Sequence, residues 1–463
     1  MRAMNIVLIN PRTVKASTFP TGEFFSCTAP NMGLAYLAAV LEQENHDVKI
    51  IDAQALGLDD EGLKKTLLNL EPEIIGVTAT TTTIYDGFNA INIGKELYPR
   101  AFTIMGGIHA SCLPVETLQE CSQLDAVCIG ESEETVVELT CALEKGMNEL
   151  TRVKGIAYRW ENRIRKTPPR ISLPDLDALP LPARHLLPME YYALGGHPHR
   201  TASIVSSRGC PFKCTFCATP FIAGRRYRAR SAESILNEIE QIVSKYKMNS
   251  FEFVDDLFTL DNRRVEAICS GIIERGMKVR WSCSSRADTV NPCLLTTMAD
   301  AGCGCIFYGI ESGSQRILDC IRKGESLKQI EEAVRCTREA GIQTWGFFIL
   351  GFPEETREDL ERTIRFACEL DLDFAEFFIA SAFPGSALYE RAKRDDLVLM
   401  ENWSDISYGK ANIKNPVLFP QDVQEYLIKA YRDFYTSSRV VSRLLREGKA
   451  QLLSEIKYQT GYG

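Results

Sequence analysis

The sequence predicts an α/β protein in which two arrays of parallel strands and helices follow one another along 463 residues. Three observations support this prediction. Apolar runs alternate with amphipathic stretches over residues 1–150, the alternation returns from residue 201, and a proline-rich segment lies between the two arrays. We expect an N-terminal Rossmann-like (flavodoxin-like) parallel sheet, then a partial (β/α)6 barrel of the TIM type, and a helical C-terminal segment.

Five apolar runs mark the strands expected in the first domain, residues 1–150. They are NIVLIN, DVKIID, IIGVTAT, FTIMGG and DAVCIG. Leu34, Leu37 and Leu41 share one face of the helix expected between the first two runs. Ligands of such sheets bind beyond the carboxyl ends of the strands. These ends are rich in glycine and hydroxyl groups but contain no GxGxxG, so we do not expect a plain dinucleotide site.

Residues 151–200 depart from this alternation. The stretch GIAYRWENRIRKTP predicts a hairpin that turns at Glu161 and Asn162. The stretch PDLDALPLPARHLLP is dense in proline and predicts an extended connector. We therefore expect a hairpin and a linker between the two arrays.

The partial barrel is expected over residues 201–393. One of its helices begins with a capping-box pair, Ser326 and Gln329, and ends before Gly341. Six βα units of roughly 30 residues each predict a shortened version of the eight-fold barrel. Residues 394–463 are expected to form amphipathic helices. The six strand candidates begin near Ala202, Ser250, Val279, Cys305, Gln343 and Phe374.

Composition and charge exclude several classes of protein. The formal net charge of −8 argues against a general nucleic-acid binder, and no apolar run reaches the roughly 20 residues of a membrane span. The apolar stretch at the N-terminus is too short for a signal peptide and is expected to be a strand. We therefore expect a cytoplasmic protein with reduced cysteines. Most of the sixteen, such as Cys269 and Cys336, have the spacing of buried helix residues.

The stretch SSRGCPFKCTFCATP places Cys210, Cys214 and Cys217 in one loop after the first barrel strand. A structural zinc site needs four ligands, and the sequence has no second CxxC pair. A disulfide is not expected in a reducing compartment, and unrelated buried thiols are not expected in a loop of Gly, Pro and Lys. Cysteine thiolates in close array hold iron–sulfur clusters. With three thiolates, a cubane cluster keeps one iron free for a substrate or cosubstrate.

The motif CPFKCTFC resembles the CxxxCxxC hallmark of the radical S-adenosylmethionine superfamily, and Phe216 is the aromatic residue that this family prefers before the last cysteine. The resemblance implies a [4Fe–4S] cluster whose free iron chelates the methionine amino and carboxylate groups of S-adenosylmethionine. The reduced cluster then cleaves the sulfonium to give a 5′-deoxyadenosyl radical. It also implies a reductant of the flavodoxin or ferredoxin type.

The same resemblance assigns cosubstrate contacts to the ends of the second and third barrel strands. Asp255 and Asp256, in FVDDLFT, resemble the acidic residues near the adenosine or the methionine amine. The alternative for either residue is an Asp that caps the following turn. Arg286, in SSRAD, is expected to meet the methionine carboxylate, because arginine favours planar bidentate contacts.

Further contacts are implied at the ends of the fourth and fifth barrel strands. Glu311, Ser312 and Gly313, in GIESGS, resemble the segment that contacts the ribose. Gly351, in ILGFP, is expected to admit the adenine. The arginine-rich stretch GRRYRAR, residues 224–230, has two readings: a solvated loop, or an anion contact to the cosubstrate, a cobalamin phosphate or an acidic substrate.

A Rossmann-like domain joined to such a barrel resembles the cobalamin-binding subgroup of the superfamily, the class B methyltransferase-like enzymes, and the resemblance covers nearly the whole chain. It implies that the nucleotide tail of cobalamin lies in a slot along the strand ends. The sequence has no DxHxxG loop, so we expect no histidine ligand to cobalt, and His109 is interpreted as a supporting or packing residue. The implied cobalamin contacts are Thr78, Thr80, Gly106, Gly107, Gly130 and Glu131.

A methylthiotransferase would need three further cysteines for a second cluster in the first domain. Cys27, Cys112, Cys121, Cys128 and Cys141 are available. Cys128 falls in an expected strand, Cys141 falls on a helical core face, and no thiol directly follows the first strand. This alternative is therefore not expected.

The resemblance implies methyl transfer to an unactivated carbon or phosphorus centre. The radical would remove a hydrogen from the substrate, methylcobalamin would supply the methyl group, and a second S-adenosylmethionine would remethylate the cobalt. One alternative is radical cyclisation or ring rearrangement of a lipid or tetrapyrrole. Another is a cobalamin-carrying or electron-transfer module that performs no reaction.

The substrate is left open as a small molecule or a lipid. In the C-terminal helices, Arg439, Arg443 and Arg446 lie beside apolar residues. That pattern is expected of a face that closes the open side of the barrel, or of a face that contacts a membrane surface.

Overall fold

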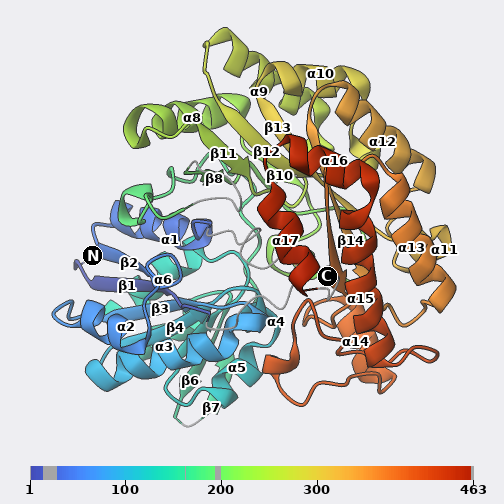
Figure 1. Ribbon diagram of the computed structural model, residues 1–463. Helices are drawn as coiled ribbons and strands as arrows, with labels where there is room; N and C mark the ends of the chain where they lie inside the picture. Colours follow the sequence, from blue (N-terminus) through green and yellow to red (C-terminus); the bar gives the residue numbers. More distant parts are fainter. Residues whose placement is uncertain (1, 14–28, 162, 193–199, 460–463) are drawn as a thin grey trace.

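The computed structural model describes residues 2–13, 29–161, 163–192 and 200–459. Its two main sheets lie side by side: the first is mostly parallel with helices on both faces, and the second is parallel and curved into part of a barrel (Figure 1). Asn162 and Cys27, which entered the sequence predictions, lie outside the described residues.

The first sheet has seven strands in the order β2-β1-β3-β4-β5-β6-β7. Strands β1 to β5 are parallel, and the predicted apolar runs form them. The hairpin β6-β7 adds to β5 in antiparallel fashion, so the first sheet continues beyond residue 150. The strands are β1 (Asn5–Asn10), β2 (Asp47–Asp52), β3 (Ile74–Thr78), β4 (Phe102–Gly106), β5 (Ala126–Cys128), β6 (Ile156–Trp160) and β7 (Arg163–Lys166).

Alternate residues of β1 enter two cores, one on each face of the sheet. Ile6 and Leu8 pack beneath α1 and α6, whereas Val7 and Ile9 pack beneath α2 and α3. Because β1 pairs with β2 on one side and with β3 on the other, the chain reverses direction across the sheet at the carboxyl ends of β1 and β3, where such sheets bind ligands. The helices are α1 (Met32–Gln43), α2 (Asp60–Leu67), α3 (Ile84–Leu97), α4 (Ile108–Cys112), α5 (Pro114–Glu120) and α6 (Glu133–Lys145).

The second sheet has six parallel strands in the order β8-β11-β12-β13-β14-β15, as the six predicted units require. Helices cover its outer face, and α12 begins with the predicted capping box. The strands are β8 (Ala202–Ile204), β11 (Ser250–Phe253), β12 (Arg280–Ser285), β13 (Cys303–Glu311), β14 (Gln343–Leu350) and β15 (Phe374–Ile379). The helices are α8 (Ala232–Tyr246), α9 (Asn262–Glu274), α10 (Pro292–Asp300), α11 (Gln315–Cys320), α12 (Leu327–Glu339) and α13 (Arg357–Glu369).

The C-terminal segment contains α14 (Ala387–Arg394), α15 (Pro420–Thr436), α16 (Ser438–Arg446) and α17 (Ala450–Gln459). Helix α15 lies along β15, the edge strand of the barrel (Figure 1). The hydroxyl of Tyr435 donates to the carbonyl of Ala375 at 2.9 Å and accepts from its N–H at 3.3 Å. The hydroxyl of Tyr431 forms the same pair of bonds with Phe377, both at 3.2 Å.

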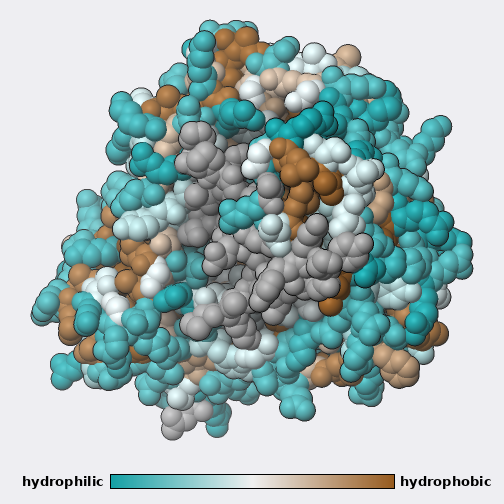
Figure 2. Space-filling model, viewed as in Figure 1, coloured by the Kyte–Doolittle hydropathy of each residue, from teal (hydrophilic) through white to brown (hydrophobic). Residues whose placement is uncertain are grey.

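The arginines of α16 contact the barrel. Arg443 donates to the carbonyls of Leu372 and Asp373, and Arg439 donates to the carbonyl of Cys368, while Arg446 is exposed. The coloured part of the face in Figure 2 is mainly hydrophilic, with hydrophobic residues in small separate patches. No helix within the described residues is long and apolar enough to cross a membrane. Two of the three arginines therefore fix α16 to the barrel.

Candidate functional site

The three cysteines lie in a loop between β9 (Ser207–Arg208) and the short helix α7 (Thr219–Ala223). Strand β10 (Arg228–Ala229) pairs with β9 in antiparallel fashion, so the two ends of the segment that holds the cysteines are joined. Cys210, Cys214 and Cys217 are all half-buried. The loop therefore presents three partly accessible thiols from a fixed base.

Gly209 anchors the start of this cysteine loop. Its φ of +86° is in the left-handed region, and a Cβ here would lie only 2.4 Å from the carbonyl oxygen of Arg226. Its N–H donates to the Asp256 carboxylate at 3.1 Å. Further along, the N–H of Thr215 donates to the carbonyl of Ile321 at 2.9 Å. The position before Cys210 therefore requires glycine.

The donor set fits an iron–sulfur cluster. Burial raises the pKa of Cys210 and of Cys214, to about 11 for Cys214, and the nearby Cys217 thiol acts in the same direction on both. Within the described residues, no three His, Cys, Asp or Glu side chains gather tightly enough to hold a single metal ion. Three neighbouring thiols that do not converge on one point suit a cluster in which each thiolate binds a different iron.

A buried charged network lies beside the cysteines. The Lys323 ammonium is 3.0 Å from the Glu311 carboxylate and 3.4 Å from that of Glu325. Burial opposes the charge on Lys323, but the two carboxylates outweigh it, so its pKa is raised. Arg286 forms two hydrogen bonds with Asp288, at 2.9 and 2.8 Å. Its Nη1 lies 3.9 Å from the Glu325 carboxylate and has no hydrogen-bond partner among the described residues. Sequence reasoning missed Lys323 and Glu325, since no motif marks two charged residues in this loop.

Of the four residues expected near the ribose and the adenine, Glu311 alone belongs to this network. It ends β13 with a φ of +67°, a conformation that costs a non-glycine residue of the order of 1–3 kcal/mol. The Ser312 hydroxyl is turned to Thr363 on α13 at 3.0 Å, and a Cβ on Gly313 would meet Phe366 at 2.5 Å. Gly351 has a φ of +89° and faces Val423 of α15.

Asp255 and Asp256 hold the segment that leads into the cysteine loop. Asp255 is buried and accepts hydrogen bonds from the Ser206 N–H and the Ser207 hydroxyl, both at 2.6 Å. Asp256 accepts from Gly209, and burial of its carboxyl raises its pKa to about 6. Both carboxylates thus bind the segment between β8 and the cysteine loop rather than capping the turn that follows β11. Phe216 packs on Phe352, which follows β14, with ring centroids 5.8 Å apart.

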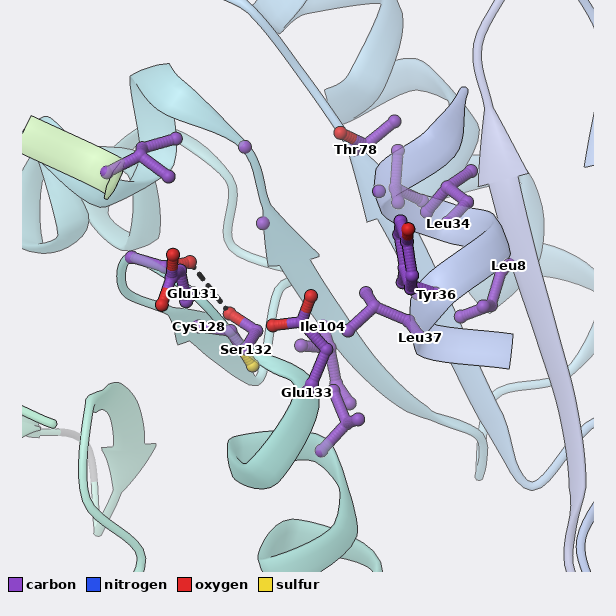
Figure 3. A pocket seen from close by; sticks show the side chains of 18 of the residues that line it. Leu8, Leu34, Tyr36, Leu37, Thr78, Ile104, Cys128, Glu131, Ser132 and Glu133 are labelled. Atoms are coloured by element: carbon purple, nitrogen blue, oxygen red, sulfur yellow. Dashed lines mark hydrogen bonds between the residues drawn. The ribbon is translucent and has the colours of Figure 1, made fainter. Parts of the chain in front are cut away.

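A cavity of about 280 Å³ lies at the carboxyl ends of the first sheet. Figure 3 shows Leu34, Tyr36 and Leu37 of α1 on one side and Glu131 and Glu133 on the other. Its lining includes five of the six strand-end residues predicted to bind cobalamin: Thr78, Gly106, Gly107, Gly130 and Glu131. The sixth, Thr80, is exposed and bonds Thr82 and Thr83.

The cavity fits part of a long ligand. A Cβ built on Gly106 meets nothing within 4 Å, so this glycine borders open space. Gly107 has a φ of +96°, and a Cβ there would lie 2.3 Å from the carbonyl of Ala79. The barrel contributes Val205, Arg208, Ile222 and Ala223 to the lining. A slot of this size, mostly apolar and closed by the second domain, suits the nucleotide tail of cobalamin.

Arginines of the barrel close the cavity by ion pairs across the domains. Arg228 is paired with Glu131, and Arg208 donates to Glu133 at 2.6 Å while its guanidinium lies 5.3 Å from the Tyr36 ring. In the arginine-rich stretch, Arg228 and Arg230 are therefore buried in ion pairs, the latter with Glu238. The solvated-loop interpretation fails for these two residues, because carboxylates of this chain bind them.

His109 packs between the first domain and the C-terminal segment. Its ring meets Trp403 edge-on, with centroids 4.8 Å apart, and its Nδ1 lies 3.3 Å from the Thr81 hydroxyl. Burial lowers the pKa of His109 to about 4. This environment is that of a neutral packing histidine, as the sequence predicted.

Two family models match the chain. One, described as the radical SAM superfamily, matches residues 204–367, and the other, described as a B12 binding domain, matches residues 25–140. The first match contains the cysteine loop, and the second contains most strand ends that line the cavity.

Three curated relatives align with nearly the whole chain. An uncharacterised methyltransferase of Pyrococcus horikoshii is 38% identical over 95% of this chain and 94% of its own length. An anaerobic magnesium-protoporphyrin IX monomethyl ester cyclase of Cereibacter sphaeroides is 30% identical over 93% of this chain and 70% of its own. A cytidylyl-2-hydroxyethylphosphonate methyltransferase of Streptomyces wedmorensis is 28% identical over 94% of this chain and 90% of its own.

A solved structure shares the fold. It is the radical S-adenosylmethionine methyltransferase TsrM from Kitasatospora setae, with cobalamin and a [4Fe–4S] cluster bound. The TM-score is 0.74 at 19% identity, over 94% of this chain and 89% of that chain. The predicted pairing of a Rossmann-like sheet with a partial barrel is confirmed.

Proposed function

Because the chain belongs to the radical S-adenosylmethionine superfamily and carries a B12-binding domain, we propose that it transfers a methyl group from S-adenosylmethionine to an unactivated carbon or phosphorus centre. The predicted family, enzyme class and cofactors are confirmed by the matches. The cofactors are a [4Fe–4S] cluster, S-adenosylmethionine and cobalamin. Cobalamin supplies a carrier for the methyl group, and the reduced cluster supplies the electron that starts the radical reaction.

The observation that supports this proposal best is the place of the cavity. It lies between the carboxyl ends of the first sheet and the segment that holds the cysteine loop, because Arg208 directly precedes Gly209 and also lines the cavity. Both cofactors would therefore act on one space at the mouth of the barrel. Cys210, Cys214 and Cys217 would hold the cluster, and Arg286 and Glu311, in the buried network beside them, would orient the cosubstrate.

Radical cyclisation is the second candidate, favoured by the 30% identity with a cyclase. The two reactions differ in how they consume S-adenosylmethionine. Methyl transfer through a carrier converts one molecule to S-adenosylhomocysteine and a second to 5′-deoxyadenosine and methionine. Cyclisation needs no methyl donor and gives no S-adenosylhomocysteine.

The test is anaerobic reconstitution with iron, sulfide and hydroxocobalamin, followed by reduction in the presence of S-adenosylmethionine labelled with CD3. We expect both S-adenosylhomocysteine and 5′-deoxyadenosine, measured by mass spectrometry, and a CD3 group in the product when an extract supplies the substrate. Formation of 5′-deoxyadenosine alone would favour cyclisation. Formation of neither would contradict both candidates, and would favour the carrier module.

We place the enzyme in the cytoplasm, with a flavodoxin or ferredoxin as its electron donor. No disulfide joins any of the fifteen cysteines that the structure describes, which supports a reducing compartment. The substrate is proposed to be a small molecule, because Arg439 and Arg443, two of the three arginines of the predicted membrane face, are bound to the barrel.

A further inference from the structure

The interior of the barrel is accessible. Along β14 the residues alternate strictly, and Phe348 and Leu350, which face the helices, are fully buried. Trp345, Phe347 and Ile349 face the interior and keep part of their surface exposed. In a complete eight-stranded barrel, inward side chains pack into layers and fill the centre. Here the inward side chains leave solvent-accessible surface, so the interior can receive a ligand.

Aromatic rings line this interior. Phe307 of β13 stacks on Phe347 of β14 with centroids 6.0 Å apart, and Phe347 lies 5.8 Å from Phe378 of β15. Phe378 in turn lies 5.6 Å from Tyr408 of the C-terminal segment. These four rings, from three neighbouring strands and the C-terminal segment, thus form one continuous aromatic wall. Such a wall suits a flat apolar group.

Two carboxyl groups face the same interior from opposite parts of the sheet. Glu252 lies on β11 and Glu376 on β15, each at an inward position between buried neighbours. Within the described residues, neither carboxyl has a hydrogen bond or an ion pair, and no cationic side chain influences either one. Burial raises the pKa of each to about 7. These groups are unlike Glu131, Glu238 and Glu311, which are all paired with basic side chains.

An unpaired, largely desolvated carboxylate costs free energy and contributes nothing to packing. A ligand with a positive charge would remove that cost, and aromatic faces attract the same charge. We propose that the barrel interior binds a substrate in which a positively charged nitrogen is joined to a flat apolar body. Glu376, which lies beside Phe347 in the register of the sheet, pairs with the nitrogen, and the wall of Phe307, Phe347 and Phe378 packs on the flat body. This inference rests on the proposed function, because it names the substrate class of that site.

The cosubstrate is itself a cation, so the two ligands must be told apart. The residues expected to bind S-adenosylmethionine follow the carboxyl ends of the strands, whereas Glu252 and Glu376 lie within β11 and β15. The measurement is therefore made on holoenzyme saturated with S-adenosylhomocysteine, so that the cosubstrate site is filled. A loss of S-adenosylmethionine affinity in the Glu252 or Glu376 variants would assign the carboxylates to the cosubstrate and overturn the proposal.

Calorimetric titration at pH 8 compares tryptamine, its neutral isostere tryptophol, and the anion indole-3-propionate. We expect tryptamine to bind at least tenfold more tightly than tryptophol, and indole-3-propionate to bind most weakly. Glu376→Gln should weaken tryptamine binding at least fivefold and leave tryptophol binding unchanged, whereas Glu252→Gln, on the distant strand β11, should weaken tryptamine binding less. Glu331→Gln, at an exposed position on α12, is the matched control and should change neither affinity.

Equal affinities for tryptamine and tryptophol, or no binding of tryptamine, would overturn the proposal, as would unchanged tryptamine binding in the Glu376→Gln variant. The titration involves no turnover, so its failure is separable from failure of methyl transfer. An enzyme that forms S-adenosylhomocysteine but shows no preference for the cation keeps the proposed function and loses only this substrate class.

Discussion

The Arg228 guanidinium donates two hydrogen bonds to the Glu131 carboxylate, at N–O distances of 2.8 and 2.6 Å, although the residues are 97 positions apart. Glu131 follows the last parallel strand of the first sheet, and Arg228 lies in the strand that closes the cysteine loop. Both side chains are more than nine-tenths buried. The pair therefore fixes the cavity and the cysteine loop relative to each other.

Arg228→Met should lower the free energy of unfolding by about 3 kcal/mol, because it leaves the buried Glu131 carboxylate with the Leu173 N–H at 3.1 Å and, as its charged partner, only Arg208 at 3.6 Å. Denaturant titration measures the change. The double variant Arg228→Met/Glu131→Leu should recover part of the loss, since it removes both charges. Arg152→Met, which breaks an exposed pair with Glu149, should change stability by less than about 1 kcal/mol. Equal effects of the buried and the exposed substitution would contradict the assigned role.

A graded series at Gly106 tests the cavity. Gly106→Ala adds a methyl group to open space and should leave corrinoid binding nearly unchanged. Gly106→Phe should fill the slot and lower the corrinoid retained after desalting at least tenfold, measured by absorbance, with the iron content unchanged. If the Phe variant retains corrinoid, the tail lies elsewhere.

Two glycines beside the cysteines differ in the space around them. Gly209→Ala and Gly224→Ala both place alanine at a positive φ, at a cost of roughly 1–2 kcal/mol. Only at Gly209 does the added carbon also approach a backbone oxygen, at 2.4 Å, whereas at Gly224 the nearest atom is 3.8 Å away. We expect Gly209→Ala to reduce iron incorporation severalfold and Gly224→Ala to keep it. Iron and sulfide analysis after reconstitution measures the difference, and equal iron contents in the two variants would contradict the role assigned to Gly209.

Cys214→Ala should abolish the iron–sulfur absorbance and the cleavage of S-adenosylmethionine to 5′-deoxyadenosine, because it removes one of three thiolate ligands. Cys293→Ala, at an exposed cysteine on α10, is the control and should retain both. A Cys214→Ala protein that still releases 5′-deoxyadenosine would show that the three cysteines do not start the reaction.

The barrel carboxyls should make stability depend on pH. Burial raises the pKa of Glu252 from 4.5 to about 7 in the folded state. The stability that the Glu252 carboxyl contributes to the folded state is therefore complete below its unfolded-state pKa of 4.5. It is lost as the pH rises through about 7. Glu252→Gln should raise the free energy of unfolding by about 1–3 kcal/mol at pH 8.5 and by much less at pH 5.5. Denaturant titrations at the two pH values measure the difference. A gain of the same size at both would mean that the carboxyl does not titrate in this range.

Most of the fold could be predicted from the sequence, because the strands of both sheets are buried on one or both faces and leave regular apolar runs. The position of the hairpin β6-β7 could not. Its sequence specifies the turn and the alternation but not the strand that it joins, and it pairs with β5.

The cysteine ligands could also be predicted, because their spacing along one loop carries the information. The ion pairs around them could not. Arg228 and Glu131 are distant in sequence, and Lys323 meets Glu311 only because β13 and the loop after α11 come together. The resemblance suggested a cosubstrate contact for Ser312, but its hydroxyl is turned toward α13, a direction that sequence alone does not give.

The two tyrosines of α15 also protect the protein from self-association. A partial barrel has an edge strand whose N–H and C=O groups are free to pair with a strand of another molecule. Tyr431 and Tyr435 each occupy the N–H and the C=O of one residue of β15, as a neighbouring strand would. The barrel can therefore remain open toward a large ligand without offering a template for aggregation along that edge.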